Sequence, residues 1–151
     1  MKIRTDYVTN SSSSSFILGF KNADEIADII KNELPSYWRE DIIQEVISDV
    51  ENGITSKEAA VKFYQDHIDT YFIKFHGKDR FDLSREERES QEYKEFVQQF
   101  IDSRTAAFVE SANEYEIISI VEYEDGFKLG SELEHDIMPY LNCTIQRISH
   151  H

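Results

Sequence analysis

The 151-residue chain has little of several residue types, and each scarcity narrows the class of protein. Its single cysteine, Cys143, cannot form an internal disulfide, so we expect a reducing, cytoplasmic setting. The five glycines form no Walker, Rossmann or Gly-x-Ser-x-Gly motif. No apolar run approaches the roughly twenty residues of a membrane span, and no apolar signal segment opens the chain. We therefore expect neither membrane insertion nor export.

Basic residues are also scarce. Sixteen Lys and Arg stand against thirty Asp and Glu, for a net charge of −14. This balance argues against direct binding to nucleic acid or to an anionic membrane, because phosphate neutralisation needs clustered cations. The acidic residues are spread along the chain, which is typical of a solvated surface. An acidic mimic of nucleic acid, filling a basic groove of another protein, remains an alternative.

Hydrophobic residues make up 40% of the chain and aromatic residues 13%. This composition supports a packed core, and the length is that of one domain, which we expect to span residues 1–151.

A serine run near the N-terminus is the most unusual stretch of the chain. It lies between the β-forming segments 2–8 and 16–20. Serine and asparagine side chains compete for backbone hydrogen bonds, so we expect residues 9–15 to form a polar loop. Such a loop could serve as a docking or modification site, or bind a phosphate through its hydroxyls. The candidate residues are Thr9, Asn10, Ser11, Ser12, Ser13, Ser14 and Ser15.

The opening residues Met1 to Ile17, which read MKIRTDYVTNSSSSSFI, carry a resemblance. They resemble the "DFVTNSSSSSF" beginning of a set of uncharacterised bacterial proteins, chiefly from Gram-positive species, with Tyr7 where Phe is more usual. The resemblance implies a bacterial cytoplasmic origin and an unassigned role. It carries over no catalytic residues.

Helical spacing of apolar residues predicts four helices, near 22–34, 36–53, 55–77 and 84–108. Three of these begin with capping boxes, Asn22 with Glu25, Thr55 with Glu58 and Ser84 with Glu87. Residues 71–76 fit either the end of the third helix or a short strand, and the apolar spacing favours the helix. Gly53 occupies a position typical of a left-handed helix terminus.

The pattern changes after the fourth helix. Residues 116–123 are rich in β-branched side chains and predict a strand, which the turn residues 124–126 end. A short helix near 131–141 and a last strand near 143–149 follow. The order predicts an α+β fold, in which N- and C-terminal strands form a small sheet and four to five helices pack against it. We expect helices on one face of the sheet and helical hairpins beside it.

Candidate metal ligands are confined to the C-terminal region. Glu134, His135, His150 and His151 offer nitrogen and oxygen donors suited to a divalent metal. The spacing is not that of a known metal motif, neighbouring residues of a helix project in different directions, and the last two histidines could derive from a purification tag. A metal-dependent enzyme is therefore an alternative, and the leading expectation includes no cofactor. A buried, inert Cys143 is expected.

The aromatic content is the stronger indication of function. Core packing is the default for aromatic residues, and the alternative is a partner or dimer surface formed by some of five of them: Tyr37, Trp38, Tyr64, Tyr71 and Tyr140. With no enzyme motif present, the sequence favours a non-enzymatic protein-interaction domain with a protein partner or a second copy.

Overall fold

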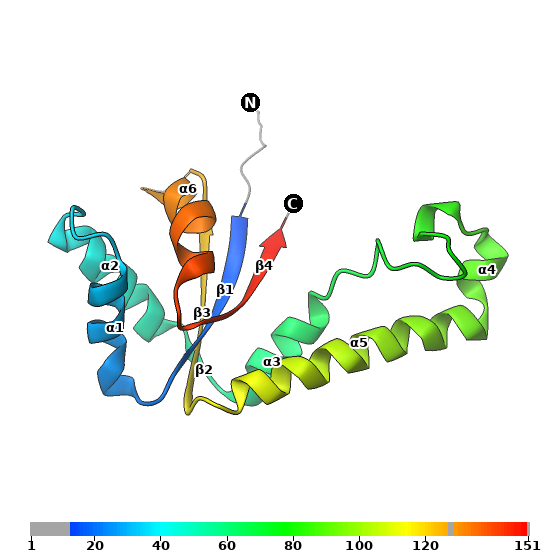
Figure 1. Ribbon diagram of the computed structural model, residues 1–151, viewed down its shortest axis with the longest axis horizontal. Coiled ribbons are helices and arrows are strands. Elements are labelled where there is room, and N and C mark those ends of the chain that lie inside the picture. The colour runs from blue at the N-terminus through cyan, green and yellow to red at the C-terminus, as the bar shows by residue number, and fades with distance from the viewer. Residues whose placement is uncertain (1–12, 127–128, 151) are drawn as a thin grey trace.

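An antiparallel sheet lies at the centre of the computed structural model, which describes residues 13–126 and 129–150 (Figure 1). Its inner strand β1 (Ser13–Phe20) pairs with β3 (Ile117–Glu124) on one side and with β4 (Thr144–His150) on the other. The short strand β2 (Ile54–Thr55) extends the edge, giving the order β2-β3-β1-β4. The α+β class and the sheet built from terminal strands are confirmed. The strand expected at 2–8 lies outside the described residues.

One face of the sheet is covered by α1 (Ile26–Glu33) and α2 (Glu40–Asn52). A short helical segment after β3 completes this layer, comprising α6 (Gly130–Glu132), the π-helical turn η3 (Leu133–Ile137) and η4 (Met138–Tyr140). The apolar face predicted for the second helix is entirely buried here: Trp38, Ile42, Ile43, Val46, Ile47 and Val50.

The opposite face is covered by α3 (Lys57–Asp66) and by the end of α5 (Gln91–Ala112). Ile17 of β1 packs there against Ala60 and Phe108, whereas its neighbours Phe16 and Leu18 point into the first layer. Successive strand residues face opposite sides, and both sets in β1 are buried. The expectation of helices on one face is therefore wrong, because β1 is buried on both faces.

Several predicted helix boundaries are also wrong. The second helix begins at Glu40 and not after Ser36, because Arg39 is still extended. The third ends at Asp66, so residues 71–76 continue no helix. There His76 and Gly77, both with positive φ, form a tight turn closed by backbone hydrogen bonds between Phe75 and Lys78.

The Asn22 cap is confirmed. Asn22 precedes the one-turn helix η1 (Ala23–Glu25), and its side-chain oxygen accepts a hydrogen bond from the Glu25 N–H. The third helix is capped by Ser56 and not by Thr55. The Ser84 capping box is confirmed, but it opens only the short α4 (Arg85–Glu89). Ser90 then caps α5 separately, because its extended backbone interrupts the helix that the sequence predicts as continuous.

Residues 68–104, here called the arm, lead away from the sheet (Figure 1), and their two ends, near Ile68 and Arg104, lie beside β4. The arm holds η2 (Arg80–Asp82), α4 and the first part of α5. Only Phe108 and Ala112 of α5 are buried, so the long buried face predicted for this helix is wrong for its first part. In the described part of the chain, no helix is long and apolar enough to cross a membrane.

Candidate functional site

The serine run enters the sheet instead of forming a loop along its whole length. Ser13, Ser14 and Ser15 belong to β1, and Ser14 and Ser15 are buried. The loop prediction is wrong for these three residues, because β1 is paired on both sides and its backbone groups are satisfied by the neighbouring strands. Burial also removes Ser14 and Ser15 from any docking surface. The candidates Thr9, Asn10, Ser11 and Ser12 lie outside the described residues.

Ser14 points into the layer formed by the helical segment after β3. Its hydroxyl donates to Oε2 of Glu134 at 2.8 Å and accepts from Nε of Arg147 at 3.1 Å. The Glu134 side chain is fully buried, and Arg147 Nη2 lies 3.8 Å from the same carboxylate oxygen. A buried carboxylate needs such donors, because a charge that is removed from water without a partner is strongly destabilising. Oε2 of Glu134 is therefore held by Ser14 and Arg147.

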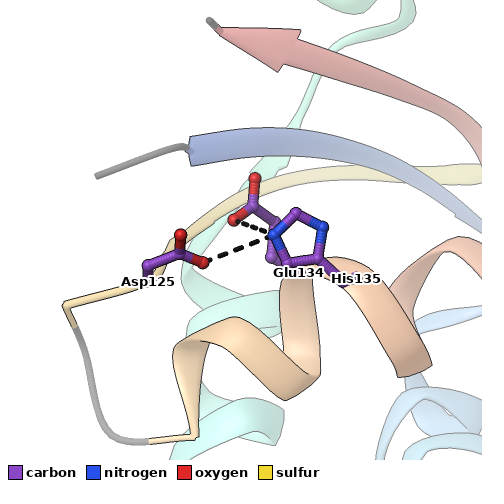
Figure 2. Close-up of side chains that lie close together, drawn as sticks. All are labelled: Asp125, Glu134 and His135. Carbon is purple, nitrogen blue, oxygen red and sulfur yellow. Dashed lines mark ion pairs between the residues drawn. The ribbon is translucent and has the colours of Figure 1, made fainter. Parts of the chain in front are cut away.

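The other oxygen of Glu134 faces His135 and Asp125 (Figure 2). His135 Nε2 lies 3.2 Å from Oε1 of Glu134 and 3.4 Å from Oδ1 of Asp125. We call Asp125, Glu134 and His135 the triad. Its three donor atoms lie within 4.8 Å of one another, the arrangement expected of residues that could hold a metal ion.

The triad is assembled by two elements that meet at one end of the sheet. Asp125 follows the last residue of β3, and the other two members lie in the π-helical turn η3. The sequence-based expectation that neighbouring helical residues point apart is wrong for Glu134 and His135, since their side chains converge on one point (Figure 2). Such π turns occur frequently at functional sites.

Arg147 also orients the imidazole. Its Nη2 lies 3.4 Å from Nδ1 of His135, and a guanidinium can only donate. Nδ1 is therefore the acceptor, and the neutral ring carries its proton on Nε2, between the two carboxylates. Among the described residues, the carboxylates of Asp125 and Glu134 thus lie on the Nε2 side of the ring and Arg147 lies on the Nδ1 side.

Ser15 points to the opposite face and makes a separate cluster. Its hydroxyl lies 2.8 Å from Nε2 of His150, which is 3.7 Å from Glu122. The ring of His67 meets the His150 ring edge-on, with centroids 5.4 Å apart. The structure thus brings Glu134 and His135 together but places His150 across the sheet, and His151 lies outside the described residues.

Sequence reasoning missed Asp125, Ser14 and Arg147 as parts of this cluster. The sequence analysis placed Asp125 only in the turn that ends the strand at 116–123. The available signal was topological: a strand paired antiparallel to β1 must end beside the beginning of β1, which places the turn after β3 near the serines.

Cys143 is buried as predicted. Burial, together with the nearby charge of Glu33, raises the pKa of its thiol to about 12, so the thiolate nucleophile is suppressed at neutral pH.

A second candidate surface is aromatic. Of the residues predicted at a partner surface, Tyr37, Tyr71 and Tyr140 are exposed, whereas Trp38 is buried and Tyr64 stacks on Phe108. The arm adds two exposed rings that the sequence analysis had not named, Phe72 and Phe81, at 73% and 71% exposure. The aromatic patch of the arm, as we use the term, consists of Tyr71, Phe72 and Phe81.

Comparisons of this α+β chain with protein-family models, with curated proteins and with solved structures find no match. The functional argument therefore rests on the geometry of the triad and of the arm.

Proposed function

We propose that this protein is an interaction domain that associates with a second copy of itself through the arm. The observation that carries the proposal is the arm itself, a long helical projection that carries exposed aromatic side chains away from the sheet. The contact surface thus moves from the serine run, where we first expected it, to residues 68–104.

The arm has its own small core, which supports it as a defined surface. Phe75 and Leu83 are buried, and the Phe75 ring contacts the rings of Tyr93 and Phe96 at centroid distances of 5.2 Å. Ion contacts join its segments, with His76 Nε2 2.9 Å from Glu92 Oε1. A surface fixed in advance loses less conformational entropy when it binds.

The aromatic patch supplies the affinity. Tyr71 and Phe81 stack at 6.1 Å, and the Arg80 guanidinium lies 4.9 Å from the centre of the Tyr71 ring. Aromatic and arginine side chains dominate the binding energy of protein interfaces. Burying one such ring is worth about 1.5–3 kcal/mol, so leaving Phe72 and Phe81 in water is unfavourable unless a partner covers them.

Charge favours a second copy as that partner. The arm holds seven of the sixteen Lys and Arg residues but only nine of the thirty Asp and Glu residues, so most of the net charge of −14 lies outside it. When two copies meet through their arms, the more acidic parts outside the arms stay apart, which limits electrostatic repulsion between the copies. Twofold dimers of this kind are the commonest protein oligomers.

Sedimentation equilibrium of the untagged full chain tests the proposal. The wild type should approach twice its mass of 17.7 kDa as concentration rises. The double variant Phe72→Ser/Phe81→Ser should remain monomeric. The matched control is Tyr140→Ser, which removes a ring of 78% exposure outside the arm and should dimerise like the wild type. A wild type that stays monomeric, or a double variant that still dimerises, would overturn the proposal.

We also propose the bacterial cytoplasm as the compartment. The support is the lone buried Cys143 thiol together with the resemblance of the opening seventeen residues. The role of Thr9 to Ser12 in docking or modification stays a prediction.

A further inference from the structure

We propose that the triad of Asp125, Glu134 and His135 binds one divalent transition-metal cation, of the Zn²⁺ or Mn²⁺ class. This site is independent of the arm and of the dimer proposed above. The inference concerns binding, and its ligands are one imidazole nitrogen and two carboxylate oxygens.

Two of the three separations between donor atoms match those of a coordination sphere. Ligand atoms about 2.0–2.2 Å from a tetrahedral metal lie roughly 3.3–3.6 Å from one another. The observed separations from His135 Nε2 are 3.2 Å to Glu134 Oε1 and 3.4 Å to Asp125 Oδ1. A cation could therefore replace the proton on Nε2, with the two carboxylates closing around it from separations within 4.8 Å.

The two carboxylate oxygens of Glu134 have different roles: Oε2 is held by neighbouring side chains, and Oε1 is the proposed metal ligand. Ser14 donates to Oε2 and Arg147 approaches the same oxygen, whereas Oε1 lies 3.2 Å from Nε2 of His135. Hydrogen bonds to the outer atoms of metal-binding side chains orient them, and their removal typically weakens metal affinity. Ser14 would be such a positioning residue, held rigidly because it lies in the central strand.

Charge and access both suit a cation. The donor oxygens of two carboxylates lie within 4.8 Å of each other, and a positive ion between them relieves their repulsion. The side chains of His135 and Asp125 are 41% and 37% exposed, so an ion can enter from solvent although Glu134 is fully buried. Three protein ligands leave at least one coordination position for water.

Arg147 sets a limit on the affinity. With a metal on Nε2, the neutral ring must carry its proton on Nδ1, which then faces the guanidinium at 3.4 Å. Arg147 must turn away on binding, and its 30% exposure leaves it room to do so. We therefore expect moderate affinity.

The experiment is calorimetric titration of the untagged, chelator-treated full chain with Mn²⁺ and, separately, with Zn²⁺. The expected result is saturable binding of one ion per chain. Asp125→Asn and His135→Ala should each weaken binding by at least about tenfold. Asp125→Asn is the decisive variant, because Asp125 is partly exposed in a turn and its change leaves the buried contacts of Glu134 intact.

The matched control is the double variant His150→Ala/His151→Ala. It removes the two C-terminal histidines but leaves the triad unchanged, so its affinity should equal that of the wild type. Circular dichroism confirms that each variant is folded before its titration is interpreted. Absence of stoichiometric binding by the wild type would overturn the inference, as would binding that survives Asp125→Asn and disappears in the histidine double variant. Neither result depends on dimer formation, which the sedimentation experiment measures separately.

Discussion

The Ser14 hydroxyl donates to the carboxylate of Glu134 at 2.8 Å, although 120 residues separate them in the chain. Arg147 of β4 donates to the same hydroxyl, so one side chain of the central strand connects to both the π turn and the last strand. The two contacts fix the end of the sheet at which the triad lies. A buried acid, a buried hydroxyl and an arginine thus form one unit, and changing any member should affect the others.

The contribution of this contact to stability can be measured directly. Ser14→Ala leaves Glu134 buried without its hydroxyl donor, so the free energy of unfolding should fall by about 1–3 kcal/mol. Ser13→Ala is the control, because Ser13 lies at the half-buried start of the same strand and its change should stay within about 0.5 kcal/mol. Urea unfolding of both variants gives the comparison. Equal losses in the two would contradict the importance of the Ser14 contact.

Gly53 is required by close packing. Its φ of −89° shows that the left-handed terminus predicted from the sequence is wrong. A Cβ atom there would lie 2.3 Å from the carbonyl oxygen of Ile120 and 2.8 Å from Ser119 Oγ. Gly53→Ala should therefore destabilise the fold by about 1–3 kcal/mol, as overpacking of a core does.

The control for this substitution is Gly126→Ala. A Cβ atom at Gly126 would meet nothing within 4 Å, so thermal or urea unfolding should change little. A neutral Gly53→Ala would show that α2 can move away from β3 without loss.

The Cys143 thiol should be unreactive while the protein is folded. Its pKa is raised to about 12, chiefly by burial, from an ordinary value of 9.0. At pH 8 a thiol reagent should label the native protein slowly and the urea-unfolded protein fast. Rapid labelling of the native state would contradict this burial.

The same pKa shift predicts a dependence of stability on pH. The folded thiol holds its proton more tightly than the unfolded one, so its contribution is complete below about pH 9 and is lost as pH rises towards 12. The free energy of unfolding, measured by urea at a series of pH values, should therefore change differently with pH in the wild type and in Cys143→Ala only in this alkaline range. Tyr123, whose pKa is also raised by burial, is common to both proteins and does not affect the difference.

Hydrogen exchange should divide α5 into two parts. Its buried residues, Phe108 and Ala112, lie at the C-terminal end, so amides near them should exchange only through global unfolding. Amides within residues 91–104 should exchange faster, through local opening of the arm. In the dimer proposed above, protection of this first part should rise with protein concentration. Uniform protection along the helix at low concentration would contradict the division.

Local patterns in the sequence predicted most of the elements. Helical spacing identified the buried face of α2, and the apolar, β-branched run predicted β3. The capping box at Ser84 could be predicted because its hydrogen bonds join residues only three positions apart, Ser84 and Glu87. These features depend on neighbours in the chain, so they can be recognised without knowledge of the fold.

The misplaced boundaries share a physical cause. Ser13 to Ser15 prefer loops as free residues, but pairing with β3 and β4 overrides that preference. The aromatic residues of 71–76 have helical spacing, yet the turn at His76 and Gly77 folds this segment back on α5, where Phe75 finds its partners. Tertiary contacts decided both segments.

The sequence by itself determined the α+β class, the acidic surface and the presence of donor residues near the C-terminus. Tertiary structure alone decided which donors meet. Antiparallel pairing placed the end of β3 beside the start of β1, which brought Asp125 to Glu134 and His135, and strand alternation sent His150 to the other face. The same packing buried only the end of α5, at Phe108 and Ala112, and left the arm outside both core clusters. Spacing along a chain cannot show these outcomes, since they depend on distances between segments that only folding brings together.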